Sequence, residues 1–304
     1  MTPGDQPRLA KRVVAIGGGR GLATSLRSLR QLSSDVKAIV SVADDGGSSG
    51  RLRHDTDRAA PGDIRKCIQA LADNDSLFSR SLDFRFDDNE LRGHALGNLV
   101  LAALADASGS LITATAEVAR LVGIVGEVIP VTADPVQLMA TTISGEHLCG
   151  QVAIMATKGL DRVWLERSPC GAGMGTSQIE VNPAAVSAID AADVVVLGPG
   201  SLYTSVLAAA MVNGVHEALV THAEKVVYVC NVATQSGETQ SYSVSDHIQA
   251  LRRHGIVPGR VLFDETALEL GGSIPNGVAA SLMAPDGITH DVARLAVALS
   301  GLVA

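Results

Sequence analysis

Four loops in this chain combine glycine, hydroxyl and acidic residues, and each loop follows a short apolar run. Glycine lets backbone N–H groups come close to a phosphate, and hydroxyl groups add further hydrogen-bond donors. In an open α/β sheet, a ligand binds beyond the carboxyl ends of the strands. The sequence therefore predicts one phosphate-binding crevice, formed by residues 17–22, 43–51, 198–205 and 231–239.

The first loop reads Gly17-Gly18-Gly19-Arg20-Gly21-Leu22. It is not a Walker A loop, because no Gly-Lys-Ser/Thr follows. It also departs from the dinucleotide-binding fingerprint at Leu22, where that fingerprint requires Gly or Ala. Two interpretations stay open: the backbone binds an anion at the start of a helix, or it makes a tight turn between a strand and a helix.

The adjacent carboxylates Asp44 and Asp45 are a stronger functional signal. Two neighbouring carboxylates repel each other unless a cation, a hydrogen-bond donor or solvent compensates them. Such a pair can bind Mg²⁺, hold a ribose or another polar ring, or orient a nucleophile. The alternative is a solvated turn in which an aspartate caps the backbone. Ser48 and Ser49 follow in a glycine-rich segment that suits an anion.

The later loops offer a second phosphate site and groups that can contact the rest of a nucleotide. The phosphate candidates, in a segment that is otherwise a rigid Pro-Gly turn, are Gly198, Gly200, Ser201, Thr204 and Ser205. The side chains suited to a base, ribose or sugar are Asn231, Thr234, Gln235 and Glu238. His94 and Asn98 share a helix face one turn apart. His94 is either a ligand contact or a buried structural histidine.

Composition and missing motifs disfavour several classes of protein. The net charge of −8 and the isoelectric point of 5.4 argue against sequence-independent nucleic-acid binding. No Gly-x-Ser-x-Gly elbow is present and no cysteine has a nucleophile context, which argues against nucleophilic hydrolysis. The four cysteines lack metal or redox spacing. Without a targeting segment or a membrane-spanning run, we expect free thiols in a cytoplasmic protein.

Apolar runs that alternate with helical patterns predict the fold. The 304 residues are 46% hydrophobic but only 3% aromatic, which suits strands of small and branched residues buried beneath helices. We expect one domain, 1–304, with a Rossmann-like three-layer α/β/α fold, a mostly parallel sheet and a small β-hairpin insertion at about 128–181. The hairpin strands are expected at 136–143 and 148–155. Three of the four phenylalanines lie in 78–92 and predict a local aromatic cluster.

Six segments in order resemble the gluconeogenesis factor family of bacterial proteins. These segments are 17–22, 43–53, 61–65, 93–99, 198–205 and 231–239, and the resemblance extends from about Arg12 to Leu251. Arg20 stands where the family usually has a small hydroxyl residue, and the chain after residue 255 is only weakly similar to the family. The family shares its fold with 2-phospho-L-lactate transferases, which make a deazaflavin coenzyme.

The resemblance implies a cytosolic UDP-sugar-binding regulator of cell shape and of cell-wall (peptidoglycan) precursor metabolism, especially on gluconeogenic carbon sources. The implied ligand is UDP-N-acetylglucosamine or UDP-glucose, with no required cofactor and no catalytic residues. The implied partners are a cell-wall enzyme or kinase and further copies of the same chain. The expected ligand-binding residues are Gly18, Gly19, Arg20, Gly21, Leu22, Asp44, Asp45, Ser48, Ser49, His94, Asn98, Gly198, Gly200, Ser201, Thr204, Asn231, Thr234 and Gln235.

The alternative is an enzyme similar to the transferases. It would move a phospho-lactyl-type group from a nucleotide diphosphate to an acceptor hydroxyl, with Asp44 and Asp45 binding Mg²⁺. A deazaflavin acceptor is a flat tricyclic ring, and the sequence shows no aromatic-rich segment near the motifs to receive it.

Overall fold

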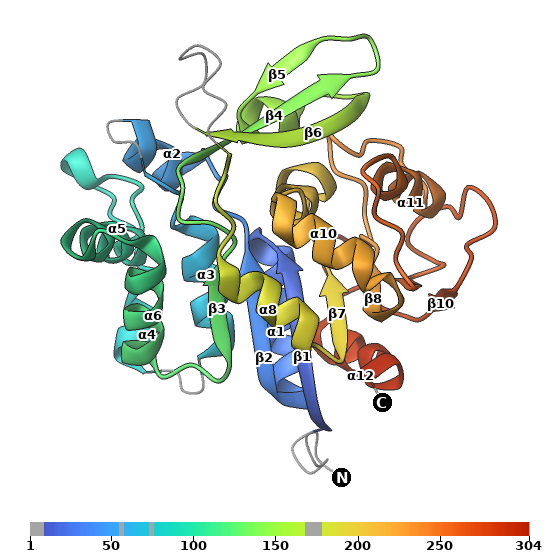
Figure 1. Ribbon diagram of the computed structural model, residues 1–304, viewed down its shortest axis with the longest axis horizontal. Helices are drawn as coiled ribbons and strands as arrows, with labels where there is room; N and C mark the ends of the chain where they lie inside the picture. Colours follow the sequence, from blue (N-terminus) through green and yellow to red (C-terminus); the bar gives the residue numbers. More distant parts are fainter. Residues whose placement is uncertain (1–8, 55–57, 73–75, 168–177, 304) are drawn as a thin grey trace.

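The computed structural model describes residues 9–54, 58–72, 76–167 and 178–303 (Figure 1). Its main sheet has seven strands in the order β10-β9-β8-β7-β1-β2-β3. The strands are β1 (Leu9–Gly17), β2 (Ser33–Val40), β3 (Glu127–Pro130), β7 (Val194–Leu197), β8 (Val226–Val229), β9 (Arg260–Phe263) and β10 (Gly277–Ala279). Every pairing in this sheet is parallel, which confirms the predicted Rossmann-like α/β class.

The strand order changes direction beside β1. The chain adds β2 and then β3 on one side of β1, and returns to place β7 and the later strands on the other side. Ile16 therefore lies between Ile39 of β2 and Leu197 of β7. This is the topological switch point, where open α/β sheets form a crevice at the carboxyl ends of their strands. Two of the four predicted loops, residues 17–22 and 198–205, follow β1 and β7, the strands on either side of the switch point. They are called the first and second glycine loops below.

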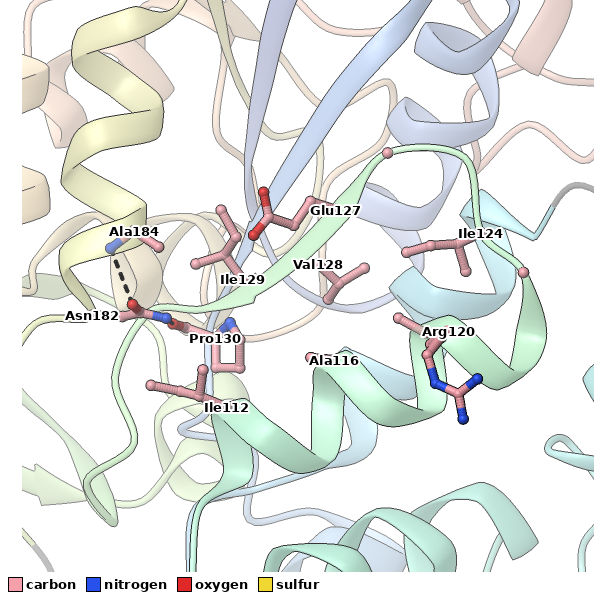
Figure 2. Close-up of a pocket in the computed structure, with 13 residues that line it drawn as sticks. Ile112, Ala116, Arg120, Ile124, Glu127, Val128, Ile129, Pro130, Asn182 and Ala184 are labelled. Carbon is pink, nitrogen blue, oxygen red and sulfur yellow. Dashed lines mark hydrogen bonds between the residues drawn. The ribbon is translucent and has the colours of Figure 1, made fainter. Parts of the chain in front are cut away.

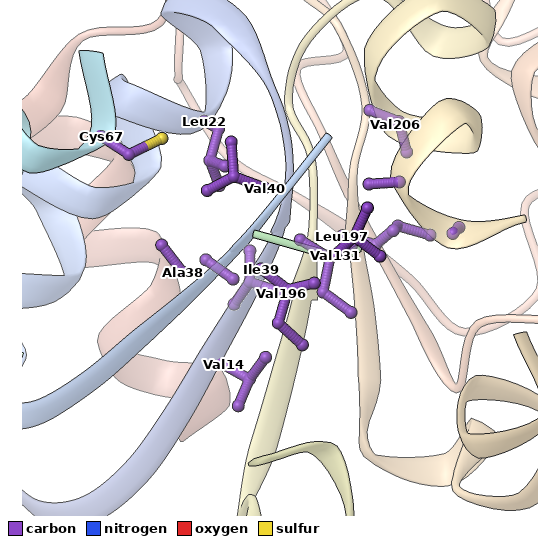
Figure 3. Close-up of a cluster of buried hydrophobic side chains, with 14 of the residues drawn as sticks. Val14, Leu22, Ala38, Ile39, Val40, Cys67, Val131, Val196, Leu197 and Val206 are labelled. Carbon is purple, nitrogen blue, oxygen red and sulfur yellow. The ribbon is translucent and has the colours of Figure 1, made fainter. Parts of the chain in front are cut away.

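The central strands are apolar on both faces because helices cover both sides of the sheet. Val14, Ile39 and Val196 are at most 1% exposed, and Figure 3 shows them packed between neighbouring strands and helices. Parallel sheets are usually buried in this way, so their strands read as continuous apolar runs. The near absence of aromatic residues is thus compatible with a large core built from Val, Ile, Leu and Ala.

Helices form two layers around the sheet. On one side α1 packs against α3 and α12, and on the other α10 packs against α8 and α9 (Figure 1). Leu22, Leu26 and Leu29 of α1 are fully buried, as their helical spacing predicts. The helices are α1 (Gly19–Leu32), α2 (Gly47–His54), α3 (Gly62–Leu71), α4 (Leu77–Ser81), α5 (Leu96–Ser108), α6 (Leu111–Val122), α7 (Gln151–Ala156), α8 (Pro183–Ala191), α9 (Ala208–Ala210), α10 (Asn213–Thr221), α11 (Val244–Arg253) and α12 (Val292–Val303), with the 3₁₀ helices η1 (Asn89–Leu91) and η3 (Ala223–Lys225) and the π-helix η2 (Leu202–Leu207).

A second, antiparallel sheet has the order β5-β4-β6 and includes the predicted hairpin. Its strands are β4 (Val136–Thr142), β5 (His147–Cys149) and β6 (Leu160–Arg167). The strand expected at 148–155 is wrong beyond Cys149. Gly150 has a φ of +97°, which ends the strand, and the apolar residues after it form α7 instead. β3, at the start of the expected insertion, belongs to the main sheet.

One cysteine departs from expectation. Cys149 is disulfide-bonded, whereas Cys67 and Cys230 are free and buried. Cys170 lies outside the described residues. Among the helices in the described ranges, none has the length and apolar character needed to cross a bilayer.

Buried histidines join distant elements. His254, after α11, donates from Nδ1 to Ala250 O at 2.7 Å, which leaves Nε2 to accept the N–H of Val163 in β6 at 2.9 Å. The ring is therefore neutral, and burial lowers its pKa. His290 lies 3.0 Å from the carbonyl of Cys230, and burial lowers its pKa to about 4.

These histidines make stability depend on pH. The unfolded chain binds a proton on His290 below pH 6.5, but the folded chain does so only near pH 4, so His290's contribution is complete above pH 6.5 and lost as the pH falls through that window. Between pH 6.5 and about 4, we expect this group to lower the free energy of unfolding by about 1.4 kcal/mol for each unit by which the pH falls. Urea titrations at several pH values should show a smaller slope in His290→Asn. The exposed His147→Asn serves as control, and an unchanged slope in His290→Asn would contradict the assignment.

Candidate functional site

The two glycine loops at the switch point touch through their backbones. A Cβ atom on Gly21 would lie 2.4 Å from the carbonyl oxygen of Pro199 and 2.6 Å from Cα of Gly200. Only glycine permits this approach. Gly200 is held from behind, since its N–H donates to Asn231 Oδ1 at 3.1 Å and its carbonyl accepts from Asn231 Nδ2 at 3.0 Å. Asn231 therefore fixes the second loop against the first.

The start of α1 has the features of an anion site. Its N-cap, Gly18, makes no side-chain capping bond, and the first turn holds no acidic residue. The first N–H groups of a helix lack intrahelical partners and carry the positive end of its dipole. Ser205 lies beside this turn, with its Cβ 3.4 Å from the place a Gly18 Cβ would take. Backbone and hydroxyl donors thus meet at one point of the crevice.

Asp44 pairs with Asp63, a residue that sequence reasoning did not select for the site. A Cβ on Gly18 would lie 2.4 Å from Asp63 Oδ2, so Asp63 borders the first glycine loop, and one on Gly62 would lie 2.8 Å from Asp44 Oδ2, which places Asp44 at the start of α3. Burial, and then the charge of Asp63, raise the pKa of Asp44, while bonds from Gly46 N–H and the Ser49 hydroxyl oppose this. Lys66 neutralises part of the charge through a 2.8 Å contact with Asp63.

Asp45 has a different position from Asp44. Its carboxylate accepts the N–H groups of Gln151 and Val152, at 2.8 and 2.9 Å, and so caps the N-terminus of α7. Gln137 of β4 adds a longer contact of 3.4 Å. Asp45 thus connects the loop after β2 to α7 and to β4 of the second sheet. Asp44 and Asp45 therefore contact different elements, although they are adjacent in the sequence.

A buried polar chain runs from α2 to α5. Ser48 Oγ lies 3.1 Å from His94 Nδ1 and accepts from Asn98 Nδ2 at 3.0 Å. Arg65 of α3 donates from Nε to Asn98 Oδ1 at 3.0 Å, and its own side chain is only 3% exposed. Burial and then Arg51 lower the pKa of His94. These pairings bring Ser48, His94 and Asn98 together beside Asp44. The shared helix face expected for His94 and Asn98 is wrong, because α5 begins at Leu96 and His94 lies before it.

An aromatic pair lies close to His94, although the sequence showed no aromatic segment near the motifs. The ring centroids of Phe84 and Phe86 are 5.1 Å apart in an edge-on arrangement. Phe86 N–H donates to the His94 carbonyl at 3.1 Å, and Phe84 is 56% exposed. The predicted phenylalanine cluster is therefore confirmed for these two residues, and it borders the 93–99 motif that follows it in the sequence.

The loops after β7 and β8 are also in contact. Gln235 Nε2 donates to Ser201 Oγ at 2.8 Å, and Gln151 of α7 donates to the carbonyl of Thr204 at 2.8 Å. Arg20 and Thr234 are exposed. All the predicted loops thus converge, and the predicted Ser205 lies among them. Asp63 and Arg65 join them from outside the predicted set. Both lie in the Pro-Gly-Asp segment, so membership of that motif was the available signal.

A cavity of about 400 Å³ lies elsewhere, between α6, β3 and the start of α8 (Figure 2). Its wall is mainly apolar. Asn182 is already bonded to Ala184 N–H and to the carbonyl of Pro130, while Arg120 pairs with Glu117. A nucleotide needs unpaired polar groups to orient it. The crevice at the switch point supplies them, whereas this cavity does not.

Comparisons with known proteins agree with the fold and the motifs. The family described as 2-phospho-L-lactate transferase CofD matches residues 13–277. The gluconeogenesis factor of Bacillus subtilis is 39% identical over 253 residues, which are 83% of this chain and 76% of the relative. That of Halalkalibacterium halodurans is 40% identical over 249 residues, 80% of this chain and 74% of the relative. The chain spans only 51% and 54% of two longer relatives, from Nostoc and Clostridium acetobutylicum.

Solved structures support the same relationship. A crystal structure from Bacillus halodurans, described as a member of the UPF0052 family, superposes with a TM-score of 0.85 at 31% identity. The match covers 98% of this chain and 99% of that one. The predicted resemblance to gluconeogenesis factors is thereby confirmed. From the family match over residues 13–277 and these relatives, the chain belongs to the 2-phospho-L-lactate transferase CofD family, within which its named relatives are gluconeogenesis factors.

Proposed function

We propose that this protein binds a UDP-sugar in the crevice at the switch point and acts as a cytoplasmic regulator of cell shape and cell-wall precursor supply. The observation that carries the proposal is the contact of Gly21 with Pro199 and Gly200. It places the uncapped start of α1, whose first N–H groups can bind a diphosphate, beside the loop of Gly200, which Asn231 holds in place.

The surrounding residues divide into those that bind and those that position. Gly18, Gly19, Gly200 and Ser201 are suited to the diphosphate. Thr234 and Gln235 extend from the next loop toward the nucleoside or sugar. Asn231 positions Gly200, and Asp45 positions α7. A regulator of this kind would present its ligand-bound form to a cell-wall enzyme or a kinase.

The second candidate is a Mg²⁺-dependent transferase, and the Asp44–Asp63 pair favours it. Two neighbouring carboxylates, the half-buried Asp44 and the buried Asp63 beside Gly18, provide the oxygen ligands that Mg²⁺ prefers. The metal would neutralise charge on the diphosphate. Phe84, exposed beside the His94 segment, would offer a surface for a flat acceptor. Asp45 is less suited to the metal than Asp63, because α7 already occupies both of its oxygens.

Ligand class is tested by thermal unfolding. A ligand that binds only the folded state raises the melting temperature. At a ligand concentration of a hundred times Kd, it adds about 2.7 kcal/mol to the free energy of unfolding. We expect UDP-N-acetylglucosamine or UDP-glucose to raise it at concentrations of about 1 mM. A shift with guanosine or nicotinamide nucleotides but none with UDP-sugars would refute the proposal.

Mass spectrometry of the same mixtures separates the two candidates. With Mg²⁺ and a long incubation, we expect the UDP-sugar to remain intact, since a regulator binds without conversion. Consumption by the wild type and none by Asp44→Asn would contradict the regulator and indicate an enzyme that cleaves the nucleotide-sugar with water in place of the acceptor hydroxyl.

The phosphate loops are tested with Gly21→Ala. The added methyl group would overlap Pro199 and Gly200, so the two loops must separate and UDP-sugar binding should weaken by about tenfold or more. Isothermal titration measures the change. Gly301→Ala is the matched control, because a Cβ there meets no atom within 4 Å. Unchanged affinity in Gly21→Ala would show that the loop contact is only structural.

Asp45→Asn tests the link to α7. Asparagine can accept one backbone N–H but turns an NH₂ group toward the other, so the unfolding free energy should fall by about 1 kcal/mol. Urea unfolding measures it, with the exposed Asp87→Asn as control. Equal stability of the two variants would mean that the capping bonds contribute nothing.

A further inference from the structure

Glu238, in the loop after β8, is a fully buried carboxyl group in direct contact with the second glycine loop. Its side chain is 0% exposed, and Oε2 accepts the N–H of Thr204 at 3.3 Å. Among the described residues, no basic side chain forms an ion pair with it. A buried carboxylate normally has such a partner, because taking a lone charge out of water is costly.

The buried oxygen atoms at and near Glu238 lack a hydrogen-bond donor. Its second oxygen, Oε1, is buried and has no partner, and the same holds for Oε1 of the nearby Gln235. Gln235 donates through Nε2 to Ser201 Oγ, so its own donor is directed to the glycine loop. Ionised carboxylates and amide oxygens are acceptors only. A neutral Glu238 would supply the missing donor to a region that has two unpaired acceptors.

The groups that face Glu238 do not favour its charge. Burial and then Cys230 raise the pKa of Tyr228 of β8, and the nearby Glu238 carboxylate adds to this, so the neighbours Tyr228, Cys230 and Tyr203 are all uncharged groups. Burial raises the pKa of Glu238 to about 7, against the opposing bonds from Thr204, Ser201 and Leu202. The carboxyl thus changes charge near neutral pH, directly behind residues expected to hold a diphosphate.

We propose that Glu238 is the proton acceptor linked to nucleotide binding, so that a diphosphate bound at Gly200 and Ser201 drives Glu238 into its neutral form. The inference rests on the proposed function. A second negative charge behind the loop would repel the ligand, whereas the protonated carboxyl keeps its contact with Thr204 and offers an O–H to an unpaired oxygen. Glu238 is therefore a positioning residue. Its protonation removes a negative charge from behind the second glycine loop, so that this loop can accept an anionic ligand.

Calorimetric titration with UDP-N-acetylglucosamine in buffers of different ionisation enthalpy measures the protons taken up. With a pKa of about 7 in the free protein, we expect uptake of about half a proton at pH 7, close to one at pH 8.5 and almost none at pH 5.5. The Kd should then increase by up to about tenfold per pH unit above pH 7.5. The diphosphate of the ligand keeps its charge throughout this range.

Glu238→Gln should bind with a Kd that does not depend on pH, and with no proton uptake at pH 8.5. Glu217→Gln, on the exposed face of α10, should behave as the wild type. Binding without proton uptake by the wild type would overturn the inference while leaving the proposed function intact, and absence of binding at every pH would instead defeat the proposed function. If Glu238→Gln fails to fold, infrared spectroscopy of the wild type tests the proposal instead, through the carbonyl band of a neutral carboxylic acid. That band should grow when ligand is added at pH 8, and a constant band contradicts the proposal.

Discussion

The close contact between two backbone segments at the switch point determines the geometry of this site. Gly21, in the first turn of α1, meets Pro199 and Gly200 at distances that exclude any side chain. Because one loop follows β1 and the other follows β7, the contact joins the two halves of the sheet at their carboxyl edge. Asn231 holds the second loop from the β8 side. This junction therefore sets how the 17–22 and 198–205 loops face each other at the predicted site.

The α/β architecture could be predicted from the sequence because the patterns that indicate strands and helices are local and repeated. Apolar runs buried on both faces and leucines at helical spacing follow directly from strand and helix periodicity. The strand expected at 148–155 failed for a tertiary reason. Its residues could form either element, and the choice was made by Gly150 at a positive φ and by Asp45, a hundred positions earlier, which caps the resulting helix.

The site was predicted at the level of motifs but not of pairings. The adjacency of Asp44 and Asp45 suggested a shared task, yet successive side chains after a strand point in different directions. Asp44 meets Asp63 and Asp45 meets α7. The partner of Asp44 could not be read from spacing, because helix α3 brings it from another part of the chain. The proximity of Phe86 to His94 likewise arises from a backbone hydrogen bond that no side-chain pattern reveals.

Helix α7 is attached to the carboxyl edge at three places. Its first N–H groups bind Asp45 after β2, the Gln151 side chain binds the Thr204 carbonyl after β7, and the Met155 carbonyl accepts the N–H of Glu238 after β8. Displacing the helix requires these three bonds to break together, although each alone is modest. A shift of α7 would therefore be felt at once by the loops after β2, β7 and β8, which lie far apart in the sequence. The helix thus makes these three loops respond as one unit.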